Sequence, residues 1–518
     1  MTILMKKIFL FLGLGLLLVG CSEEFLDVKS ETQISADNFW QSAADAQLAI
    51  NGVYAALQAR QLYGGVLNGT GSLFSHESLT DNFKNQWKWE GPGLFVEGNI
   101  DPTNNLFSTL WNQSYIGIAR ANSVIAQLDQ LPQGQLDATT KMDYDGQARF
   151  LRALLYFNLA VTFEDVPLIL EPQTLEDAYV AKNTQREVLD AIIADLSAAA
   201  AQMPASRPFN QYGYATQGAA WGLLARVYLF DQQYGMAASA AEQVMNLGYS
   251  LDNNYETLFT PARETSPEII FSVRFFQSAD TDNGETFSAT FLAIPKVDHQ
   301  PMPNLVKAYY GRDGLPTDLD PVANRDQIDP RLAASVWFSG DMFLTNPEKT
   351  FNGNTATGYG LKKYLRRETA EDGTGVFGQG SQDYYVLRYA DVLLMRAEAL
   401  IESGQTGQEV YDLINQVRQR PSVEMPRIED VEGSGLSQEE LRAIVRHERR
   451  VELAFEGLRF YDLKRWGELE AAYGRMYQDV LDGVGGYAPV YQGARSEVFP
   501  IPQEELDANP NLTQHPAW

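Results

Sequence analysis

Residues 147 to 163 read QARFLRALLYFNLAVTF, and this stretch decides the fold class of the chain. Its large apolar side chains recur at helical spacing and form an unusually wide stripe. They are Phe150, Leu151, Leu154, Leu155, Phe157 and Leu159. A stripe this wide is typical of a helix that is covered on most sides, so the stretch predicts a buried helix inside a helical protein.

Similar signals extend outward from this helix along most of the chain. Thr216 is placed to cap a helix, and Ser437 with Glu440 forms a capping box. The further predicted helices cover 45–58, 184–202, 216–230, 236–246, 389–402, 407–420 and 437–455. The pairs 216–230 with 236–246 and 389–402 with 407–420 alternate small and aromatic residues, as tetratricopeptide hairpins do.

The segment between the two pairs, about 249–385, has a different character. It is rich in Pro, Gly, Asn, Asp and aromatic residues, and only short strands such as 268–276 are recognisable. We therefore expect a mainly α protein, in which tetratricopeptide-like hairpins form a scaffold, with a loop-rich region and a few short strands. Loops laid over a scaffold are where binding surfaces are usually built.

The N-terminus has the pattern of an exported lipoprotein. Lys6 and Lys7 precede an apolar run, residues 8–19, which is too short to span a bilayer and reads as a signal peptide. The run ends directly before Cys21, the single cysteine, in a sequence that resembles a lipobox. We predict a signal peptide at 1–20, a lipid-anchored tether at 21–35 and one domain at 36–518. That domain has an N-terminal part (36–248), a loop-rich part (249–385) and a C-terminal helical part (386–518).

Composition excludes several classes of function. The net charge of −27 argues against nucleic acid as a partner, because that affinity comes largely from Lys and Arg. Membrane association should then come from acyl chains on Cys21. The four histidines lack metal-ligand spacing, so we expect no metal centre and no cofactor. Asp280, Asp282 and Gly284 give a weak calcium signal that fits a solvated turn better.

The predicted helix 437–455 places two carboxylates, Glu448 and Glu452, on its apolar face. A buried carboxylate needs a partner, and Arg459 and Arg465 follow closely in sequence. We expect a structural ion-pair network of these four residues. The alternative, a catalytic acid pair, fits less well, because nearby arginines lower carboxylate pKa values while a general acid needs a raised one.

Several segments together resemble the SusD/RagB-like outer-membrane lipoproteins. The resemblance is carried by 147–157, 389–398, 446–467, 499–502 and the C-terminal 509–518, and by the Cys21 start. It implies a helical fold with four tetratricopeptide-like hairpins and no catalytic activity. It also implies that the protein faces the cell exterior, binds a nutrient, most often an oligosaccharide, and acts as a lid on a SusC-like TonB-dependent β-barrel transporter.

A glycan site needs flat aromatic side chains beside polar ones, because a sugar ring presents an apolar C–H face and hydroxyl groups. The loop 81–89 has this composition, and Trp87 and Trp89, two residues apart, should face the same way if the segment is extended. The candidate ligand-binding residues are Asp81, Asn82, Trp87, Trp89, Trp337, Tyr359 and Arg366. Trp111 reads as a structural residue near a helix start.

Three other functions stay open at this point. The first is a peptide-binding RagB-type component of the same kind of complex, which would need fewer stacked tryptophans. The second is a surface glycoside hydrolase, which requires two carboxylates across a cleft, one with a raised pKa. The third is a pure tetratricopeptide scaffold without a small ligand.

Overall fold

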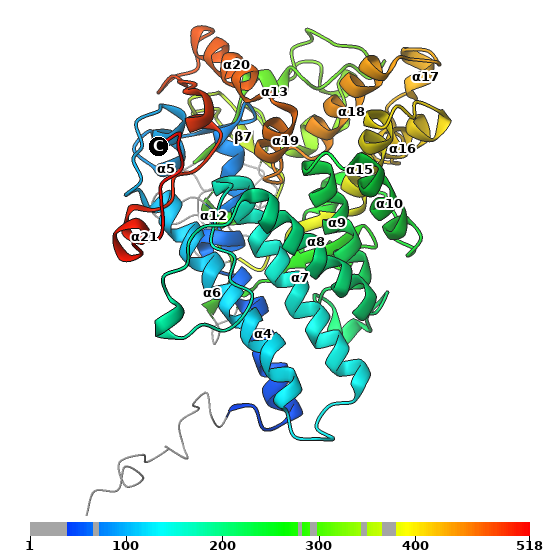
Figure 1. Cartoon of the computed structure of the whole chain (residues 1–518). Helices are drawn as coiled ribbons and strands as arrows, with labels where there is room; N and C mark the ends of the chain where they lie inside the picture. Colours follow the sequence, from blue (N-terminus) through cyan, green and yellow to red (C-terminus); the bar gives the residue numbers. More distant parts are fainter. Residues whose placement is uncertain (1–38, 66–71, 278–281, 291–297, 343–349, 365–379) are drawn as a thin grey trace, which may run out of the picture.

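Helix α7 (Ala138–Phe163) runs through the helical half of the molecule, as Figure 1 shows. Its first turns are polar, and it begins well before the apolar stretch because the Asp137 carboxylate accepts a hydrogen bond from the Thr140 amide and caps it. From Gln147 to Phe163 every residue except Arg149 is buried, since helices pack on both of its sides. The structure is a computed structural model, and it describes residues 39–65, 72–277, 282–290, 298–342, 350–364 and 380–518.

The fold is mainly α, as predicted. The longer helices are α4 (Ala43–Leu57), α6 (Asn105–Gln127), α7, α8 (Gln185–Gln202), α9 (Gln217–Phe230), α10 (Tyr234–Met245), α15 (Tyr389–Glu402), α16 (Gln408–Arg418), α18 (Gln438–Glu452) and α20 (Leu469–Leu481). Shorter ones include α5 (Gly91–Val96), α11 (Tyr255–Leu258), α12 (Phe287–Thr290), α13 (Pro303–Val306), α14 (Pro330–Ser335), α17 (Ile428–Val431), α19 (Arg459–Trp466) and α21 (Gln503–Ala508).

The two predicted hairpins, α9 with α10 and α15 with α16, are confirmed and are neighbours in space. Helix α10 packs directly on α15, although about 140 residues separate them in sequence. The series α6, α7, α8, α9, α10, α15, α16 therefore forms one layer of consecutive packed helices. The sequence suggested dispersed pairs, and tertiary packing makes them continuous.

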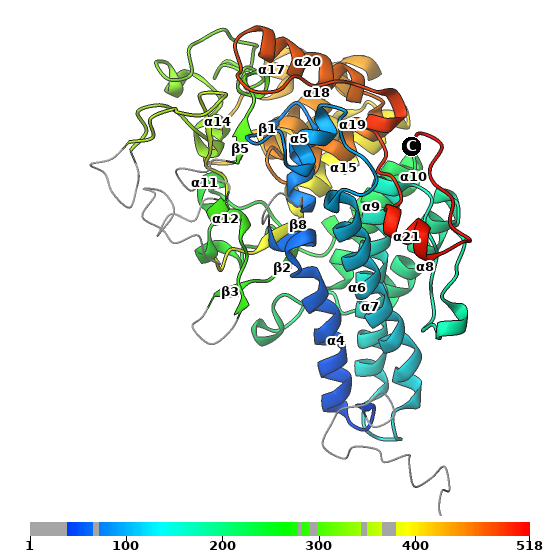
Figure 2. The same ribbon diagram turned by 90° about the vertical axis from the view of Figure 1, so that its left-hand side faces the viewer.

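An antiparallel strand pair brings the two ends of the loop-rich region together. Strand β2 (Ile269–Val273) pairs with β8 (Tyr384–Arg388), and both strands are fully buried. Within the described residues, three further sheets are also two-stranded and antiparallel. They are β1 (Phe83–Asn85) with β5 (His299–Pro301), β3 (Phe276–Gln277) with β4 (Asp282–Asn283), and β6 (Val336–Trp337) with β7 (Gly360–Leu361). Figure 2 shows this region lying along one side of the helices.

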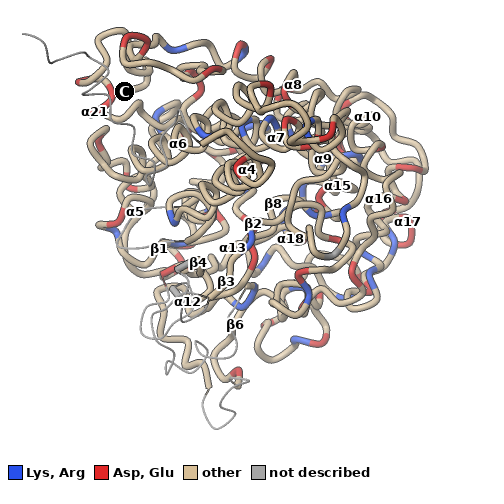
Figure 3. Tube along the Cα trace, turned by 90° about the horizontal axis from the view of Figure 1, so that it is seen from below, with Lys and Arg blue, Asp and Glu red and all other residues tan. Residues whose placement is uncertain are grey.

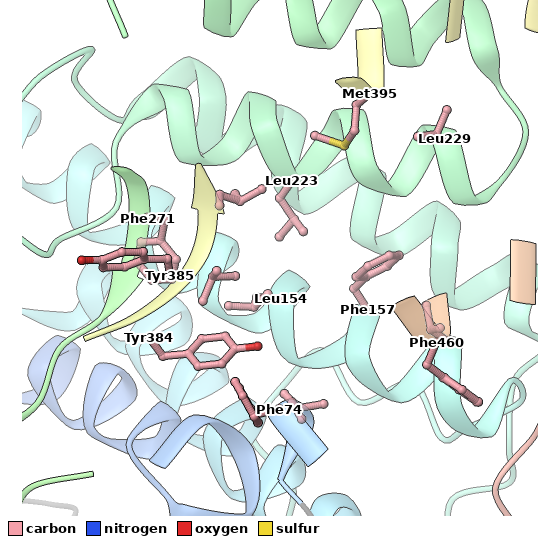
Figure 4. Close-up of a cluster of buried hydrophobic side chains, with 14 of the residues drawn as sticks. Phe74, Leu154, Phe157, Leu223, Leu229, Phe271, Tyr384, Tyr385, Met395 and Phe460 are labelled. Atoms are coloured by element: carbon pink, nitrogen blue, oxygen red, sulfur yellow. The ribbon is translucent and has the colours of Figure 1, made fainter. Parts of the chain in front are cut away.

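The core joins all three parts of the chain, as Figure 4 shows. Leu154 and Leu223 from the N-terminal part lie in one cluster with Phe271 and Tyr384 from the loop-rich part and Met395 from the C-terminal part. All five side chains are buried. Burying each large apolar side chain contributes about 1.5–3 kcal/mol, so this shared core stabilises the three parts as one unit.

The capping signals are confirmed, and one predicted helix end is wrong. Thr216 caps α9, and Ser437 forms the predicted capping box at the start of α18. Helix α18 ends at Glu452 instead of Phe455, because Phe455 adopts a left-handed backbone with φ of 70°.

Within the described ranges, no helix has the length and apolar character that a membrane crossing requires. The predicted signal peptide and tether, which include Cys21, lie outside the described residues, as do Asp280 and Arg366.

Candidate ligand-binding surface

Two tryptophans lie side by side just after strand β1. The ring centroids of Trp87 and Trp89 are 6.2 Å apart, and their planes are inclined by 34°. Trp89 is 61% exposed, and Trp87 is partly exposed. The Asn85 side chain fixes this turn, since its amide donates hydrogen bonds to the Trp87 carbonyl and to the Glu90 carboxylate, both at 2.9 Å. The pair therefore exposes aromatic surface to solvent from an anchored loop.

Two segments that are distant in sequence, residues 352–358 and 483–486, pack beside the β1–β5 strand pair. Gln300 on β5 lies opposite Lys84 on β1, and its side-chain oxygen accepts a hydrogen bond of 2.8 Å from the Ala356 amide. The Gly485 amide in turn donates to the Ala356 carbonyl at 3.3 Å. Residues 352–358 and 483–486 thus lie next to the strand that leads into Trp87. We call residues 86–89 with these two segments the tryptophan surface.

Lys84, which is buried, links strand β1 to the C-terminal segment of the tryptophan surface. Its Nζ atom lies 3.6 Å from the ring centroid of Tyr487 and donates a 3.0 Å hydrogen bond to the Tyr487 carbonyl. Burial lowers the pKa of Lys84 to about 8. The cation–π contact and the hydrogen bond connect β1 to the C-terminal segment. They therefore fix residues 86–89 and 483–486 relative to each other.

The expectation that Asp81 and Asn82 contact the ligand is corrected by their positions. Asp81 is fully buried and pairs with Arg450 at 3.0 Å, Arg459 at 3.0 Å and Arg475 at 2.7 Å. Burial alone would raise its pKa, but the three guanidinium groups outweigh it and hold the pKa well below its usual range. Asn82 is also buried; it donates to Glu77 and accepts from Arg450. Both side chains therefore act inside the protein.

The secondary candidates Trp337 and Tyr359 differ in their exposure to solvent. Trp337 is buried in β6, which removes its ring from solvent and corrects its assignment as a ligand contact. Tyr359 is partly exposed in the turn before β7, with its ring edge-on to Phe338 at 5.6 Å. It follows segment 352–358 directly and so remains a candidate beside the tryptophan surface. Arg366 lies outside the described residues. Trp111, expected to be structural, is 3% exposed within α6.

Glu448 and Glu452 are both buried and paired, but their partners differ from those expected. Glu452 accepts hydrogen bonds from Arg388 at 2.7 Å, Arg420 at 2.9 Å and Arg331 at 3.0 Å. Arg331 also binds Glu448 at 2.5 Å. Burial would raise the pKa of Glu452, but these arginines outweigh it and hold the pKa below its ordinary range. A catalytic acid would need the opposite shift.

The assignment of Arg459 and Arg465 as the partners of these glutamates is wrong. Arg459 pairs with Asp81, and Arg465 pairs with Glu398 and Asp462. Figure 3 shows basic and acidic positions close together around α15 and α18. The true partners come from α14, β8 and the end of α16, at 30 to 121 residues' distance. No local spacing pattern in the sequence points to them.

The comparisons with known proteins agree with this architecture. Residues 267–518 match the SusD family, and residues 24–229 match a second family described as starch-binding associating with outer membrane. The chain belongs to the SusD family. A SusD-like protein P2 of Formosa agariphila is 28% identical over 97% of both chains.

Solved structures of SusD-like proteins resemble this SusD-family chain along nearly their whole length. A SusD-like carbohydrate binding protein from Bacteroides fragilis has a TM-score of 0.80 and 27% identity, covering 92% of this chain and all of its own. A laminarin binding SusD-like protein has a TM-score of 0.73 and 25% identity, with the same coverage. SusD-family membership therefore rests on sequence and on fold.

Proposed function

We propose that this SusD-family protein is a cell-surface lipoprotein that binds an oligosaccharide at the tryptophan surface and delivers it to a SusC-like TonB-dependent transporter. The observation that carries the proposal is the exposed, side-by-side arrangement of Trp87 and Trp89. The two neighbouring rings offer apolar surface to the C–H faces of a sugar chain, and the exposed side chains of Lys88, Asn352 and Asn354 supply polar groups for its hydroxyls.

The relatives support a carbohydrate as the cargo. One solved SusD-like structure is that of a carbohydrate binding protein, and another binds laminarin. A shared fold alone does not transfer a ligand, so the argument for this chain depends on its own aromatic pair.

The proposed location follows from the N-terminal sequence. Residues 1–20 act as a signal peptide, Cys21 carries the acyl chains, and residues 21–35 tether the single domain 36–518 to the outer membrane, facing the exterior. The match to a family described as associating with outer membrane supports this placement. A single acylated cysteine with more than one chain is sufficient for stable anchoring.

We propose that the protein has no catalytic activity. Among the described carboxyl groups, Glu264 and Asp383 form a pair in which burial raises both pKa values, as a glycosidase acid would require. The Asp383 carboxylate, however, is fully buried and binds Arg274 at 3.1 Å and Ser272 at 3.2 Å. Since a glycosidic bond and water do not reach it, the pair is better explained as structural.

Isothermal titration calorimetry with neutral gluco-oligosaccharides of β-1,3, β-1,4 and α-1,4 linkage tests the binding site. Trp87→Ala and Trp89→Ala should each weaken binding by at least tenfold, which corresponds to about 1.4 kcal/mol. Tyr477→Ala, a change of an exposed aromatic side chain on α20, is the matched control and should leave affinity unchanged. Equal affinity for wild type and both tryptophan variants would refute the site.

The same purified protein is used to distinguish glycan binding from the alternative functions. A peptide library that binds where glycans do not would favour the peptide-binding alternative, and sugar products released over time would show a hydrolase. Delivery is tested in cells: deletion of the gene should abolish growth on the bound glycan, and Trp87→Ala with Trp89→Ala should slow uptake without changing the amount of protein at the surface.

A further inference from the structure

A cavity whose described lining includes no residue of the tryptophan surface lies between α6, the segment 167–180 and the C-terminal segment with α21. Its volume is about 640 Å³, within the range of about 300–1,000 Å³ that is usual for ligand sites. Figures 1 and 2 both show α21 beside α6, and the Asn112 amide donates to Glu504 across this boundary at 3.1 Å. The cavity is therefore framed by three segments far apart in sequence.

The walls of this cavity are mainly apolar. They include Trp111, Tyr115, Ile169, Pro172, Val180 and Leu512. Several polar side chains that line it are already bonded to the protein: the Tyr115 hydroxyl donates to the Pro167 carbonyl, Asn122 to the Ile169 carbonyl, and Asn509 to the Val180 carbonyl. Sugar hydroxyls would find few free partners here, so the cavity favours an apolar group.

The charged groups of the cavity are acidic. Glu505 lines it and is half-buried, and burial, with the neighbouring Glu504, raises its pKa. Within the described part of the chain, no ion pair to the Glu505 carboxylate is present. Glu171 also lines the cavity, and its described lining includes no lysine, arginine or histidine. A cation placed beside Glu505 would thus relieve an unfavourable carboxylate.

Exposed apolar side chains extend the cavity into a larger face. Leu175 is 94% exposed, Tyr179 58% and Leu170 39%, and all three lie on the segment that forms one wall. Ile116 on α6 is 43% exposed at the opposite wall. Apolar surface that continues beyond a pocket and is rimmed by polar residues is typical of protein interaction sites.

We propose that this face docks a segment of another protein that carries an apolar anchor side chain next to a lysine or arginine. The anchor enters the cavity between Trp111, Tyr115 and Pro172, while its cationic neighbour pairs with Glu505. Leu175 and Tyr179 cover the flanking residues. Charge complementarity selects this occupant, because a second copy of the strongly acidic chain would bring like charges together. The proposal is independent of glycan binding at the tryptophan surface.

Site-specific photo-crosslinking on intact cells tests the proposal. Benzoylphenylalanine in place of Leu175 should give one discrete protein adduct, and mass spectrometry should place it on a segment with a lysine or arginine beside an apolar residue. The same probe at Leu481, which is 63% exposed on α20, is the control and should give no such adduct. The Glu505→Lys change should reduce the Leu175 adduct at least tenfold.

A synthetic peptide of the crosslinked segment then tests the geometry by fluorescence anisotropy on the purified full chain. Glu505→Lys should weaken peptide binding at least tenfold, and a peptide with its cation changed to Glu should restore it. Ala119→Trp, at an exposed position that lines the cavity, should block the anchor.

Three results would overturn the proposal: no protein adduct at Leu175, an adduct unaffected by Glu505→Lys, or peptide binding unaffected by Ala119→Trp. Oligosaccharide affinity, measured on the same variants, should equal that of the wild type, so failure of this face is distinguished from failure at the tryptophans.

Discussion

Arg388 and Glu452 are joined by a hydrogen bond of 2.7 Å between Nη1 and Oε1, and both side chains are buried. Arg388 ends strand β8 directly before α15, whereas Glu452 ends α18. Arg388 also binds Glu268, just before β2, at 2.8 Å. One guanidinium group therefore ties both ends of the loop-rich region to the C-terminal helices.

Removing the charge of Glu452 should strongly destabilise the protein. Glu452→Gln leaves Arg331, Arg388 and Arg420 without their shared carboxylate, and breaking a buried pair typically costs about 3–5 kcal/mol. Urea unfolding followed by circular dichroism measures the change. Glu439→Gln, at an exposed position in the first turn of the same helix, should change stability by less than about 0.5 kcal/mol. Similar losses in both variants would contradict the network.

Asp391 should make stability depend on acidic pH. Burial would raise its pKa, but Arg226 and Arg449 outweigh burial and lower the pKa to about 2, against about 3.9 in an unfolded chain. The unfolded state therefore takes up the proton first as pH falls. The contribution of Asp391, about 2–3 kcal/mol, is complete above about pH 4 and is lost between about pH 4 and pH 2.

The pH dependence is measured as unfolding free energy in urea between pH 7 and pH 2. Asp391→Asn should be less stable at neutral pH and should show a shallower decline with acid. Asp412→Asn, an exposed change on α16, should keep the wild-type slope. Parallel curves for wild type and Asp391→Asn would show that this carboxylate does not carry the effect.

Gly457 should not tolerate a side chain. Its φ is +74°, and a Cβ atom there would lie 2.7 Å from the Tyr384 hydroxyl and 3.0 Å from the Leu73 carbonyl oxygen. Gly457→Ala should cost at least about 1–2 kcal/mol from the left-handed backbone alone. Gly474→Ala is the matched control, because this helical glycine has open space around it and should gain about 0.5–1 kcal/mol. Thermal unfolding of both variants measures the difference. Equal melting temperatures would contradict the prediction that only position 457 requires glycine.

Replacement of Trp89 and replacement of Trp111 should have very different effects on the stability of the fold. Trp89→Ala removes a mostly exposed ring and should change the unfolding free energy by less than about 0.5 kcal/mol. Trp111→Ala removes a buried ring that contacts Tyr115 and Phe163, so it should cost about 3–5 kcal/mol. Chemical denaturation gives both values. A large loss for Trp89→Ala would mean that this ring is part of the core.

Sequence patterns predicted the local features of this protein correctly. The apolar stripe of 147–163, the Thr216 cap and the Ser437 capping box depend on residues within four positions of one another, so their structural meaning is contained in the sequence. The fold class and the family resemblance follow from such features. Trp87 and Trp89 are also close in space, but they lie in a turn and not in the extended segment on which the prediction of a shared direction depended.

Tertiary structure decided what depends on distant residues. The composition of its loop predicts Asp81 as a ligand contact, but arginines 369 to 394 positions away neutralise it. Glu452 takes its partners from α14, from β8 and from the segment that follows α16. The cavity beside α6 exists only because the C-terminal segment returns to it. Helical periodicity is a short-range property of the backbone, whereas charge pairing and cavity shape depend on which distant segments pack together.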